Sequence, residues 1–472
     1  MKNPDIVVVG GGLAGLVTAV RAAELGLKVV VLERQAEERY LCNSRISSGV
    51  FHFCVNAPRT DAALLTEKAK SALDPSVDPA LISAVADSVS GCITWLQQQG
   101  ARFVSRNDPA WPHHTHLLAP IAPMQLGRQW EGRGGDVLLR TLEGRLLKSG
   151  GELLRGHAAT GLIERAGACK GVMGTDSDGQ SFDFHASAVV LADGGFQSNH
   201  EALKAWICSR PDRLLQRNAG TAIGSGLAMA IHAGAALSDM GGFYGHLHSR
   251  DALTNDALWP YPALDEIAAR YIVVDDAGRR LVDEGLGGIH AAAEIAKTAD
   301  PAGITIICDR NGWEGKTSAA ASGYLPVNPM LEKGGGTVLI ASTLRELALK
   351  AGIDPDGLET EITSYNKALR DGSLDQLAPE RSQGAFHAQP IDTAPFVALP
   401  AVAGITYTMG GPLIDVHSRV RHRDGGEIAG LYAAGSASGG LEGYAKNGYA
   451  GGLVKAAVTG LRAAEHIAAT YK

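Results

Sequence analysis

The sequence predicts an α/β protein in which a nucleotide-binding domain is interrupted by a second domain. Three observations support this prediction. Residues 1–33 follow the order strand, glycine-rich turn, helix and strand. Strands that run into glycine turns return near the C-terminus, over residues 430–452. Between them, from about residue 239 to 385, prolines, aromatics and histidines become denser, and short strands and helices follow one another. We therefore expect an inserted domain there.

The first 33 residues carry the most informative pattern. Residues 5–9 are an apolar run typical of a buried parallel strand. Residues 10–15 fit G-x-G-x-x-G, a small-residue helix is expected over 16–25, and an apolar strand over 27–32 precedes Glu33. An isolated G-x-G-x-x-G is a weak signal that an ordinary loop also satisfies. With every part in order, the pattern predicts dinucleotide binding.

The glycines and the acidic residue of this unit each have a physical role. Gly10 permits the tight turn, Gly12 lets a pyrophosphate approach the backbone, and Gly15 lets the helix pack on the strand. The helix N-terminus offers free N–H groups to phosphates. Glu33 can accept hydrogen bonds from a ribose 2′-hydroxyl, and its charge disfavours a 2′-phosphate, so NADP is not expected here.

Four later segments also suit cofactor binding. Residues 40–50 form a small, polar stretch for which a plain loop is the alternative. Residues 186–196 form an apolar strand that enters a Gly-Gly turn, where backbone can approach a ligand closely. Residues 430–435 repeat this pattern, and residues 447–452 open a final helix expected over 453–469. The N-terminus of that helix is a second place for an electron-rich group.

Composition excludes several classes of protein. The chain has 472 residues, 45% hydrophobic and 20% charged, which is typical of a globular protein. A net charge of -7 argues against nucleic acid or an anionic membrane as the main partner. Neither a signal peptide nor an apolar run of membrane-spanning length is expected. The six cysteines are scattered, which indicates a reduced chain, and we expect a cytoplasmic location.

A histidine cluster raises the question of a metal site. Trp111, His113, His114 and His116 lie close together in the sequence. However, neither a carboxylate nor a cysteine stands at ligand spacing, and Pro112 marks a loop. The sequence therefore predicts no metal.

Taken together, these segments resemble the flavoprotein subunit of the fumarate reductase and succinate dehydrogenase superfamily. Its soluble branch includes flavocytochrome c fumarate reductases, ketosteroid dehydrogenases and tricarballylate dehydrogenase, and residues 282–285 look most like the last of these. The resemblance rests on eight segments in family order: 10–33, 43–49, 189–196, 224–236, 278–284, 343–354, 408–411 and 431–452.

The resemblance implies FAD rather than NAD, which is the alternative ligand for the first motif. It implies a Rossmann-like FAD-binding domain of the glutathione-reductase type, formed by 1–240 and 386–472, with an α+β capping domain at 241–385. The residues that it assigns to FAD are Gly10, Gly12, Leu13, Ala14, Gly15, Glu33, Arg34, Asn43, Ser44, Ser47, Ser48, Gly49, Ala158, Ala192, Asp193, Gly194, Asn199, Gly435, Ser436, Gly452 and Leu453.

Departures from the family pattern refine the expected activity. Asn43 stands where succinate dehydrogenases carry a histidine bound covalently to FAD, so we expect non-covalent FAD. Gly288 occupies the place of the arginine that acts as the acid in fumarate reductases. Lys446 occupies the place of an arginine that binds a carboxylate. A lysine is a poorer carboxylate clamp than the planar arginine fork. Fumarate is therefore not the expected substrate.

Four residues are the candidates for chemistry. Tyr407 replaces a family histidine and could act as base or oxyanion donor, with Lys446 as the neighbour that lowers its pKa. His248 occupies the place of a family histidine in the cap, and His246 lies beside it. The alternatives are that Tyr407 is a packed aromatic ring, that Lys446 is a solvated lysine, and that the two histidines are buried structural residues.

The sequence thus predicts an FAD-dependent dehydrogenase (desaturase) that oxidises a CH–CH bond next to the ketone or carboxylate of a small acid or cyclic ketone. An FAD-dependent enoate reductase is the alternative, and a non-catalytic flavoprotein subunit is a second. Because no second G-x-G-x-x-G is found, the expected electron acceptor is oxygen, a quinone or a carrier protein.

Overall fold

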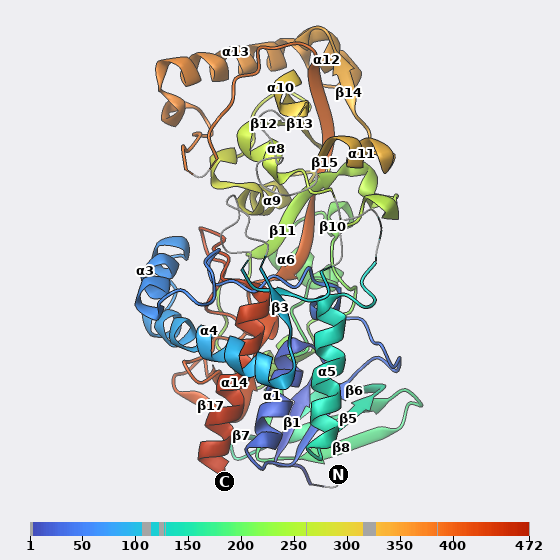
Figure 1. The fold of residues 1–472 in the computed structure, drawn as a ribbon, viewed down its shortest axis with the longest axis vertical. Helices are drawn as coiled ribbons and strands as arrows, with labels where there is room; N and C mark the ends of the chain where they lie inside the picture. The colour runs from blue at the N-terminus through green and yellow to red at the C-terminus, as the bar shows by residue number, and fades with distance from the viewer. Residues whose placement is uncertain are drawn as a thin grey trace.

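The computed structural model of the chain describes residues 3–105, 115–121, 127, 129–260, 262–314, 327–384 and 386–471, with side chains in the sixth range from residue 330. Trp111, His113 and His114 lie outside the described residues. Among the residues that are described, no three His, Cys, Asp or Glu side chains are grouped to hold a metal ion. The molecule has a lower part that contains both termini and an upper part joined to it by two long strands (Figure 1).

The lower part is built on a six-stranded sheet of order β16-β17-β9-β1-β2-β5. Its strands pair in parallel except for β16 with β17, as the buried apolar runs predicted. The strands are β1 (Ile6–Val9), β2 (Val29–Glu33), β5 (Glu152–Arg155), β9 (Ala188–Leu191), β16 (Arg419–Arg421) and β17 (Glu427–Ala433).

Helices and a small sheet cover this core. Helices α1 and α14 make extensive contact with each other, and α5 also packs on α1. A three-stranded antiparallel sheet consists of β6 (His157–Arg165), β7 (Ala168–Asp176) and β8 (Ser181–His185). The helices of this part are α1 (Leu13–Glu24), α2 (Asn43–Ile46), α3 (Ala62–Ala72), α4 (Pro79–Gln99), α5 (Gly134–Lys148), α6 (His200–Trp206), α7 (Ser225–His232) and α14 (Gly452–Tyr471). The short strands β3 (Phe103–Val104) and β4 (Leu117–Leu118) pair with each other.

Helix α4 is the one described helix that is long and apolar enough to cross a membrane. Half of its apolar window is buried inside the fold, where it packs against α3 and α14. Its apolar character is therefore accounted for by the protein core.

The upper part is built around the second large sheet. Strand β15 (Phe396–Thr408) pairs with β10, β11, β13 and β14, and β13 pairs with β12. The remaining strands are β10 (Leu215–Gln216), β11 (Phe243–Ser249), β12 (Ile272–Val274), β13 (Ile304–Cys308) and β14 (Leu339–Ala341). The helices are α8 (Asp265–Arg270), α9 (Gly288–Ala296), α10 (Arg310–Trp313), α11 (Val327–Lys333), α12 (Leu344–Ala351) and α13 (Pro355–Asp371).

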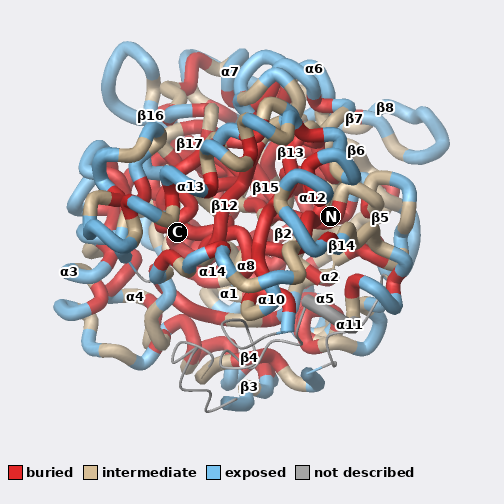
Figure 2. Tube along the Cα trace, turned by 90° about the horizontal axis from the view of Figure 1, so that it is seen from above, coloured by how far each residue is buried: buried red, intermediate tan, exposed pale blue. Residues whose placement is uncertain are grey.

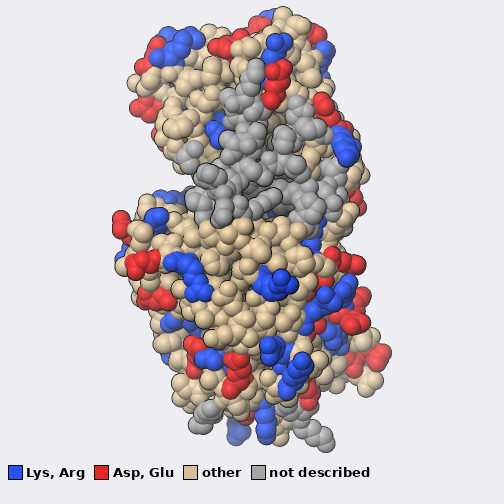
Figure 3. All heavy atoms as spheres, in the orientation of Figure 1, with Lys and Arg blue, Asp and Glu red and all other residues tan. Residues whose placement is uncertain are grey.

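The predicted cap limits, 241–385, do not enclose this sheet. Strands β10 and β15 belong to the segments that were assigned to the FAD-binding domain, yet both pair within the cap sheet. Buried residues fill the interior of both parts and exposed segments surround them (Figure 2). The molecule is hollowed at the left edge of the space-filling view, between the upper and lower parts (Figure 3).

Candidate active site

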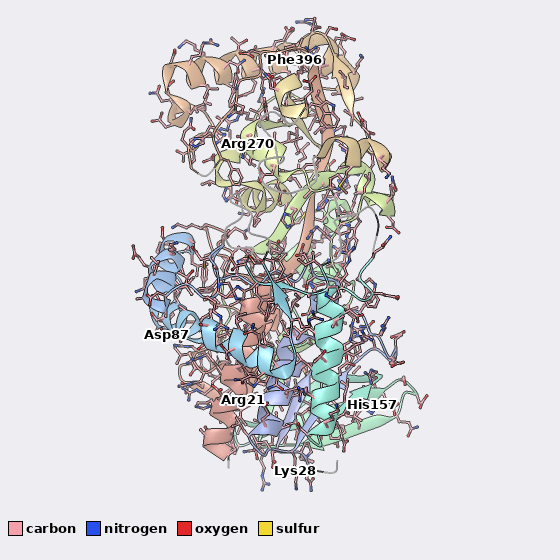
Figure 4. The ribbon with its side chains drawn as sticks, in the orientation of Figure 1. Arg21, Lys28, Asp87, His157, Arg270 and Phe396 are labelled. Carbon is pink, nitrogen blue, oxygen red and sulfur yellow. The ribbon has the colours of Figure 1, made fainter. Side chains whose placement is uncertain are left out.

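A cavity of about 230 Å³ opens at the ends of β1, β2 and β9. This position beyond the carboxyl ends of parallel strands is where open α/β sheets bind nucleotides. His157, labelled in the lower part in Figure 4, belongs to its wall. The cavity is lined by most of the residues that were predicted to hold the cofactor: Gly10, Gly12, Leu13, Ala14, Glu33, Arg34, Asn43, Ser44, Ala158, Ala192, Asp193, Gly194, Gly435 and Ser436.

Gly10, Gly12 and Gly15 have the geometry that their predicted roles require. Gly10 has a φ of +103°, a conformation that L side chains rarely adopt. A Cβ on Gly15 would lie 2.0 Å from the Gly10 oxygen, so Gly15 lets the helix pack on the strand. Among the residues that the structure describes, a Cβ on Gly12 would meet only Ser44 Oγ, at 3.9 Å. The absence of a side chain at Gly12 therefore leaves room for a ligand rather than for another part of the protein.

Glu33 is held at the end of β2 by two backbone donors. Its Oε2 accepts a hydrogen bond from the Gly11 N–H and its Oε1 accepts one from the Gln35 N–H, both at 3.0 Å. Burial raises the pKa of the carboxyl, while these N–H groups oppose that effect. The carboxylate keeps further lone pairs for ribose hydroxyls, as the motif predicts.

Asp193 and Gln197 add two buried acceptor oxygens to the cavity wall. Asp193 Oδ2 accepts a hydrogen bond of 2.7 Å from the Gly226 N–H. Neither Oδ1 of Asp193 nor Oε1 of Gln197 makes a hydrogen bond with a described residue, although both residues line the cavity. Buried acceptors are nearly always satisfied, so the hydroxyl or N–H donors of a dinucleotide fit this wall. Gln197 was not predicted, although it closely follows the Gly-Gly turn.

Asn43 connects the cavity to the end of β15. Its Nδ2 donates to the Thr406 carbonyl at 2.8 Å, and its Oδ1 accepts from the Ala219 N–H at 2.9 Å. Both ends of the amide are therefore engaged in fixing the cavity wall. An amide also lacks the ring nitrogen through which a histidine could bind a flavin covalently.

Seven predicted cofactor residues do not line the cavity. Asn199 caps α6, since its Oδ1 accepts from the Ala202 N–H at 3.0 Å. Gly452 lies against the ring of Tyr407, where a Cβ would be 3.1 Å from Cε1. The seven residues are Gly15, Ser47, Ser48, Gly49, Asn199, Gly452 and Leu453.

Tyr407 lies at the junction between the two parts, at the end of β15. Its hydroxyl donates to Glu442 Oε1 at 2.9 Å, and the same oxygen accepts from the Ala450 N–H at 2.9 Å. Lys455 Nζ lies 3.1 Å from Glu442 Oε2, and all three side chains are buried. Burial and the Glu442 charge hold the pKa of Tyr407 well above its usual value. Tyr407 therefore retains its proton, which does not suit a base.

Lys446 is not the neighbour that was predicted for Tyr407. Its side chain is exposed, and its Nζ donates to the carbonyls of Ser71 at 3.3 Å and Leu73 at 3.5 Å. The cation thus caps the end of α3, a common role for lysine at a helix C-terminus. The buried lysine that serves the tyrosine network is Lys455, which the sequence did not single out.

Three tyrosine rings gather at this junction. Tyr244 stacks on Tyr449 with ring centroids 4.2 Å apart, and it lies 5.4 Å from the ring of Tyr407. The Gly452 N–H, at the start of α14, donates to the Tyr449 hydroxyl at 3.4 Å. Tyr244 and Tyr449 are half-buried rather than enclosed. The cluster thus presents phenol groups beside a helix N-terminus.

His246 extends this cluster into the cap. Its Nδ1 is hydrogen bonded to Asp265 Oδ2, and its Nε2 lies 2.9 Å from the Tyr244 hydroxyl. The other oxygen of Asp265 accepts from the Leu247 N–H at 2.8 Å, which fixes the carboxylate. Neither Tyr244 nor Asp265 was predicted. Asp265 is the first residue of α8, and only the packing of that helix on β11 brings it to His246.

His248 is fully buried two residues further along β11. Its ring centroid is 6.4 Å from that of His246. Neither nitrogen makes a hydrogen bond of normal geometry with a described residue, although the Pro262 backbone lies near enough to favour the protonated ring slightly. Burial, then Arg217 and His246, lower its pKa well below the usual value, so the ring is neutral. Burial favours a structural role for His248.

A family model described as an FAD-binding domain matches residues 5–451. The chain belongs to this FAD-binding family. The urocanate reductase of Eggerthella lenta is 27% identical over 445 residues, which cover 92% of this chain and 70% of that protein. The NADH:acrylate oxidoreductase of Vibrio harveyi is 31% identical over 312 residues, 65% of this chain and only 29% of that protein.

The fold has a close counterpart among solved structures. The 3-ketosteroid delta1-dehydrogenase of Sterolibacterium denitrificans, solved with 1,4-androstadiene-3,17-dione, has a TM-score of 0.74 over 100% of both chains, at 20% identity. This likeness confirms the predicted FAD-binding fold with its capping sheet. The predicted superfamily is also confirmed, and the chain is an FAD-dependent oxidoreductase of the class that acts on CH–CH bonds.

Within this family, the cap arginine of fumarate reductases has no equivalent at the expected position. Gly288 stands there, and a Cβ on it would lie 2.2 Å from Asp265 Cγ. Glu284, four residues earlier, is buried and forms an ion pair of 2.5 Å with Arg280. This part of the cap therefore places a carboxylate, Asp265, where the resemblance led us to look for a cation.

Proposed function

We propose that the protein is an FAD-dependent dehydrogenase (desaturase) that oxidises a CH–CH bond next to the carbonyl of a cyclic ketone or small organic acid. The observation that carries this proposal is the cluster of Tyr244, Tyr407 and Tyr449 at the junction of cap and cofactor domain. Neutral phenols suit a carbonyl oxygen better than the two carboxylates of fumarate. Lys446, the predicted second carboxylate anchor, lies against α3 instead.

FAD would be held without a covalent bond. Gly12 would leave room for the pyrophosphate, Glu33 would accept from the ribose, and the acceptors of Asp193 and Gln197 would take donors from the dinucleotide. Asn43, whose amide is fully engaged, supports the absence of a covalent link. When bound, FAD supplies the capacity to accept or deliver a hydride.

The start of α14 suits the carbonyl of the substrate. Gly452 and the Tyr449 hydroxyl form a pair of polar groups at the helix N-terminus. The partial positive charge there favours the negative charge that develops on a carbonyl oxygen when an α-proton leaves. The Gly452 N–H thus positions the Tyr449 phenol, which would be the donor of an oxyanion site at this helix start. The Tyr407–Glu442–Lys455 network fixes the backbone just before α14, because Glu442 also accepts from the Ala450 N–H.

Reduction of an enoate is the second candidate, because the related proteins from Eggerthella lenta and Vibrio harveyi are named as a urocanate reductase and an NADH:acrylate oxidoreductase. A guanidinium that could attract a carboxylate is held at the lower end of β15, since Arg217 Nη1 donates to Thr406 Oγ1 at 3.0 Å. The same active site catalyses both directions, so direction depends on substrate and electron partner.

An anaerobic titration separates the two functions. The oxidised holoenzyme is mixed with saturated cyclic ketones and saturated acids, and bleaching of the flavin spectrum is expected with one of them. Reoxidation of dithionite-reduced enzyme by enones or enoates, with no bleaching by any saturated compound, would establish the reductase instead. Oxygen, quinone and carrier-protein acceptors are then compared by the rate at which each reoxidises the enzyme.

A further inference from the structure

We propose that Tyr244, His246 and Asp265 form a proton-transfer triad in which Tyr244 exchanges the proton with the substrate carbon. This inference deepens the proposed function and rests on it. The triad is assembled from two elements of the cap, because Tyr244 and His246 lie on β11 and Asp265 begins α8. Arg270, at the other end of α8, is labelled in the upper part in Figure 4.

The hydrogen bonds define the direction of transfer. An ionised carboxylate can only accept, so the Asp265 contact places the hydrogen of a neutral His246 on Nδ1. Nε2 then accepts from the Tyr244 hydroxyl, 2.9 Å away. The Tyr244 proton is thereby directed at His246, so a proton that reaches the Tyr244 oxygen from the substrate would displace the hydroxyl proton toward Nε2. This is the logic of a nucleophile, a base and an orienting acid.

The other two phenols are less suited to accept a proton. Tyr407 donates to Glu442, which Lys455 holds as an anion in a buried ion pair, so passing a proton to Glu442 would break that pair. Tyr449 is hydrogen bonded to the Gly452 N–H and to Tyr244, and burial and the nearby charge of Glu442 raise the pKa of its hydroxyl. In contrast, a proton received by His246 produces an imidazolium beside Asp265, which stabilises it.

The position of Gly288 indicates that a protein of this fold can have either this triad or the cap arginine of fumarate reductases, but not both. The carboxylate of Asp265 occupies the space next to Gly288, where any larger side chain would meet it. The start of α9 at Gly288 also favours the negative charge of Asp265. A single position of the cap thus admits either an arginine or the carboxylate that orients His246.

The proton step balances within the triad. The C–H bond next to the carbonyl breaks, and its electron pair remains on carbon as part of the enolate. The proton moves to Tyr244 Oη while the former hydroxyl proton of Tyr244 moves to His246 Nε2. The result is a neutral tyrosine, an imidazolium paired with Asp265, and an enolate at the oxyanion site. In the reductive direction the same groups deliver the proton.

The test compares Tyr244→Phe, His246→Asn and Asp265→Asn with wild-type holoenzyme in both half-reactions. Cyclohexanone and propionate are the saturated probes, and 2-cyclohexenone and acrylate the unsaturated ones. Loss of a general acid or base typically costs about 10²–10⁴-fold in rate, and we expect losses of that order in whichever direction the wild type reacts. Tyr432→Phe is the matched control, since Tyr432 is hydrogen bonded to His466 Nδ1 at 2.9 Å near the other end of α14.

A measurement without substrate completes the test. In ¹⁵N-histidine-labelled holoenzyme, the His246 Nδ1–H is expected to give a proton resonance far downfield, which disappears in Asp265→Asn, while Tyr244→Phe shifts the Nε2 signal. If these signals are absent, or if Tyr244→Phe and His246→Asn react within about threefold of wild type, the triad is refuted. Flavin reduction that fails with every saturated probe refutes the dehydrogenase alone, because the triad is still measured in the reductive half-reaction.

Discussion

The contrast between Gly12 and Gly15 gives a sharp prediction about the cofactor cavity. Both glycines belong to the same motif, but a methyl group added to each meets different surroundings. At Gly12 the nearest protein atom is Ser44 Oγ, 3.9 Å from an added Cβ. At Gly15 an added Cβ would be 2.0 Å from the Gly10 oxygen and 3.2 Å from Val8 Cγ1. Gly12→Ala therefore perturbs the ligand, and Gly15→Ala perturbs the fold.

The magnitudes follow from the cost of an extra methyl in a filled space. Overpacking of this kind costs about 1–3 kcal/mol. At Gly12 that cost falls on the FAD complex, so the dissociation constant is expected to rise about 5- to 150-fold. At Gly15 the cost falls on the packing of α1 against β1, because the backbone must separate. We expect the unfolding free energy of the flavin-free protein to fall by at least about 1–3 kcal/mol.

Two measurements distinguish these effects. Flavin fluorescence quenching gives the FAD dissociation constant, and urea unfolding of the flavin-free protein gives its stability. Gly12→Ala should keep the wild-type unfolding midpoint and bind FAD weakly, whereas Gly15→Ala should lower the midpoint. Wild-type FAD affinity in Gly12→Ala, or an equal loss of stability in both variants, would show that the cavity does not receive the pyrophosphate at Gly12.

Three further predictions concern charged groups. Glu442→Gln leaves Lys455 buried without its counter-ion, so the unfolding free energy should fall by about 3–5 kcal/mol, and adding Lys455→Met should recover part of that loss in a urea double-mutant cycle. Lys446→Met should leave the half-reaction rates unchanged, because among the described residues the hydrogen bonds of Nζ go to carbonyls at the end of α3. A large loss of rate would instead support the predicted contact between Lys446 and Tyr407. Burial raises the pKa of Asp193 to about 6. A raised pKa stabilises the folded state at low pH, so this group should make the flavin-free protein about 1 kcal/mol more stable at pH 5 than at pH 7, and Asp193→Asn should remove that part of the urea-measured difference.

The residues that line the cavity at the ends of β1, β2 and β9 were largely predictable because they follow local patterns. Gly10, Gly12 and Glu33 occupy fixed places in a strand-turn-helix-strand unit, and Asp193 follows a buried strand, so chain connectivity alone brings them together. Helix positions were also predicted closely: the helices expected over 16–25 and 453–469 are found at Leu13–Glu24 and Gly452–Tyr471.

The catalytic candidates were less predictable because they depend on long-range packing. Asp265 reaches His246 only through the docking of α8 on β11. Lys446 and Lys455 lie on either side of the start of α14, and no local pattern tells which of them turns inward to Glu442. The limits of the cap were equally difficult to predict from the sequence, because β15 has the pattern of an apolar strand whichever sheet it joins.

Strand β15 has a mechanical consequence for catalysis. Its 13 residues run without interruption from Phe396, labelled at the top in Figure 4, to the end that carries Tyr407. At about 3.3 Å per residue, β15 is roughly 40 Å long. A tilt of one degree about its lower end would move its upper end by roughly 0.7 Å over that length. Because Tyr407 lies near the lower end, such a tilt would displace the remote surface of the cap while moving Tyr407 least.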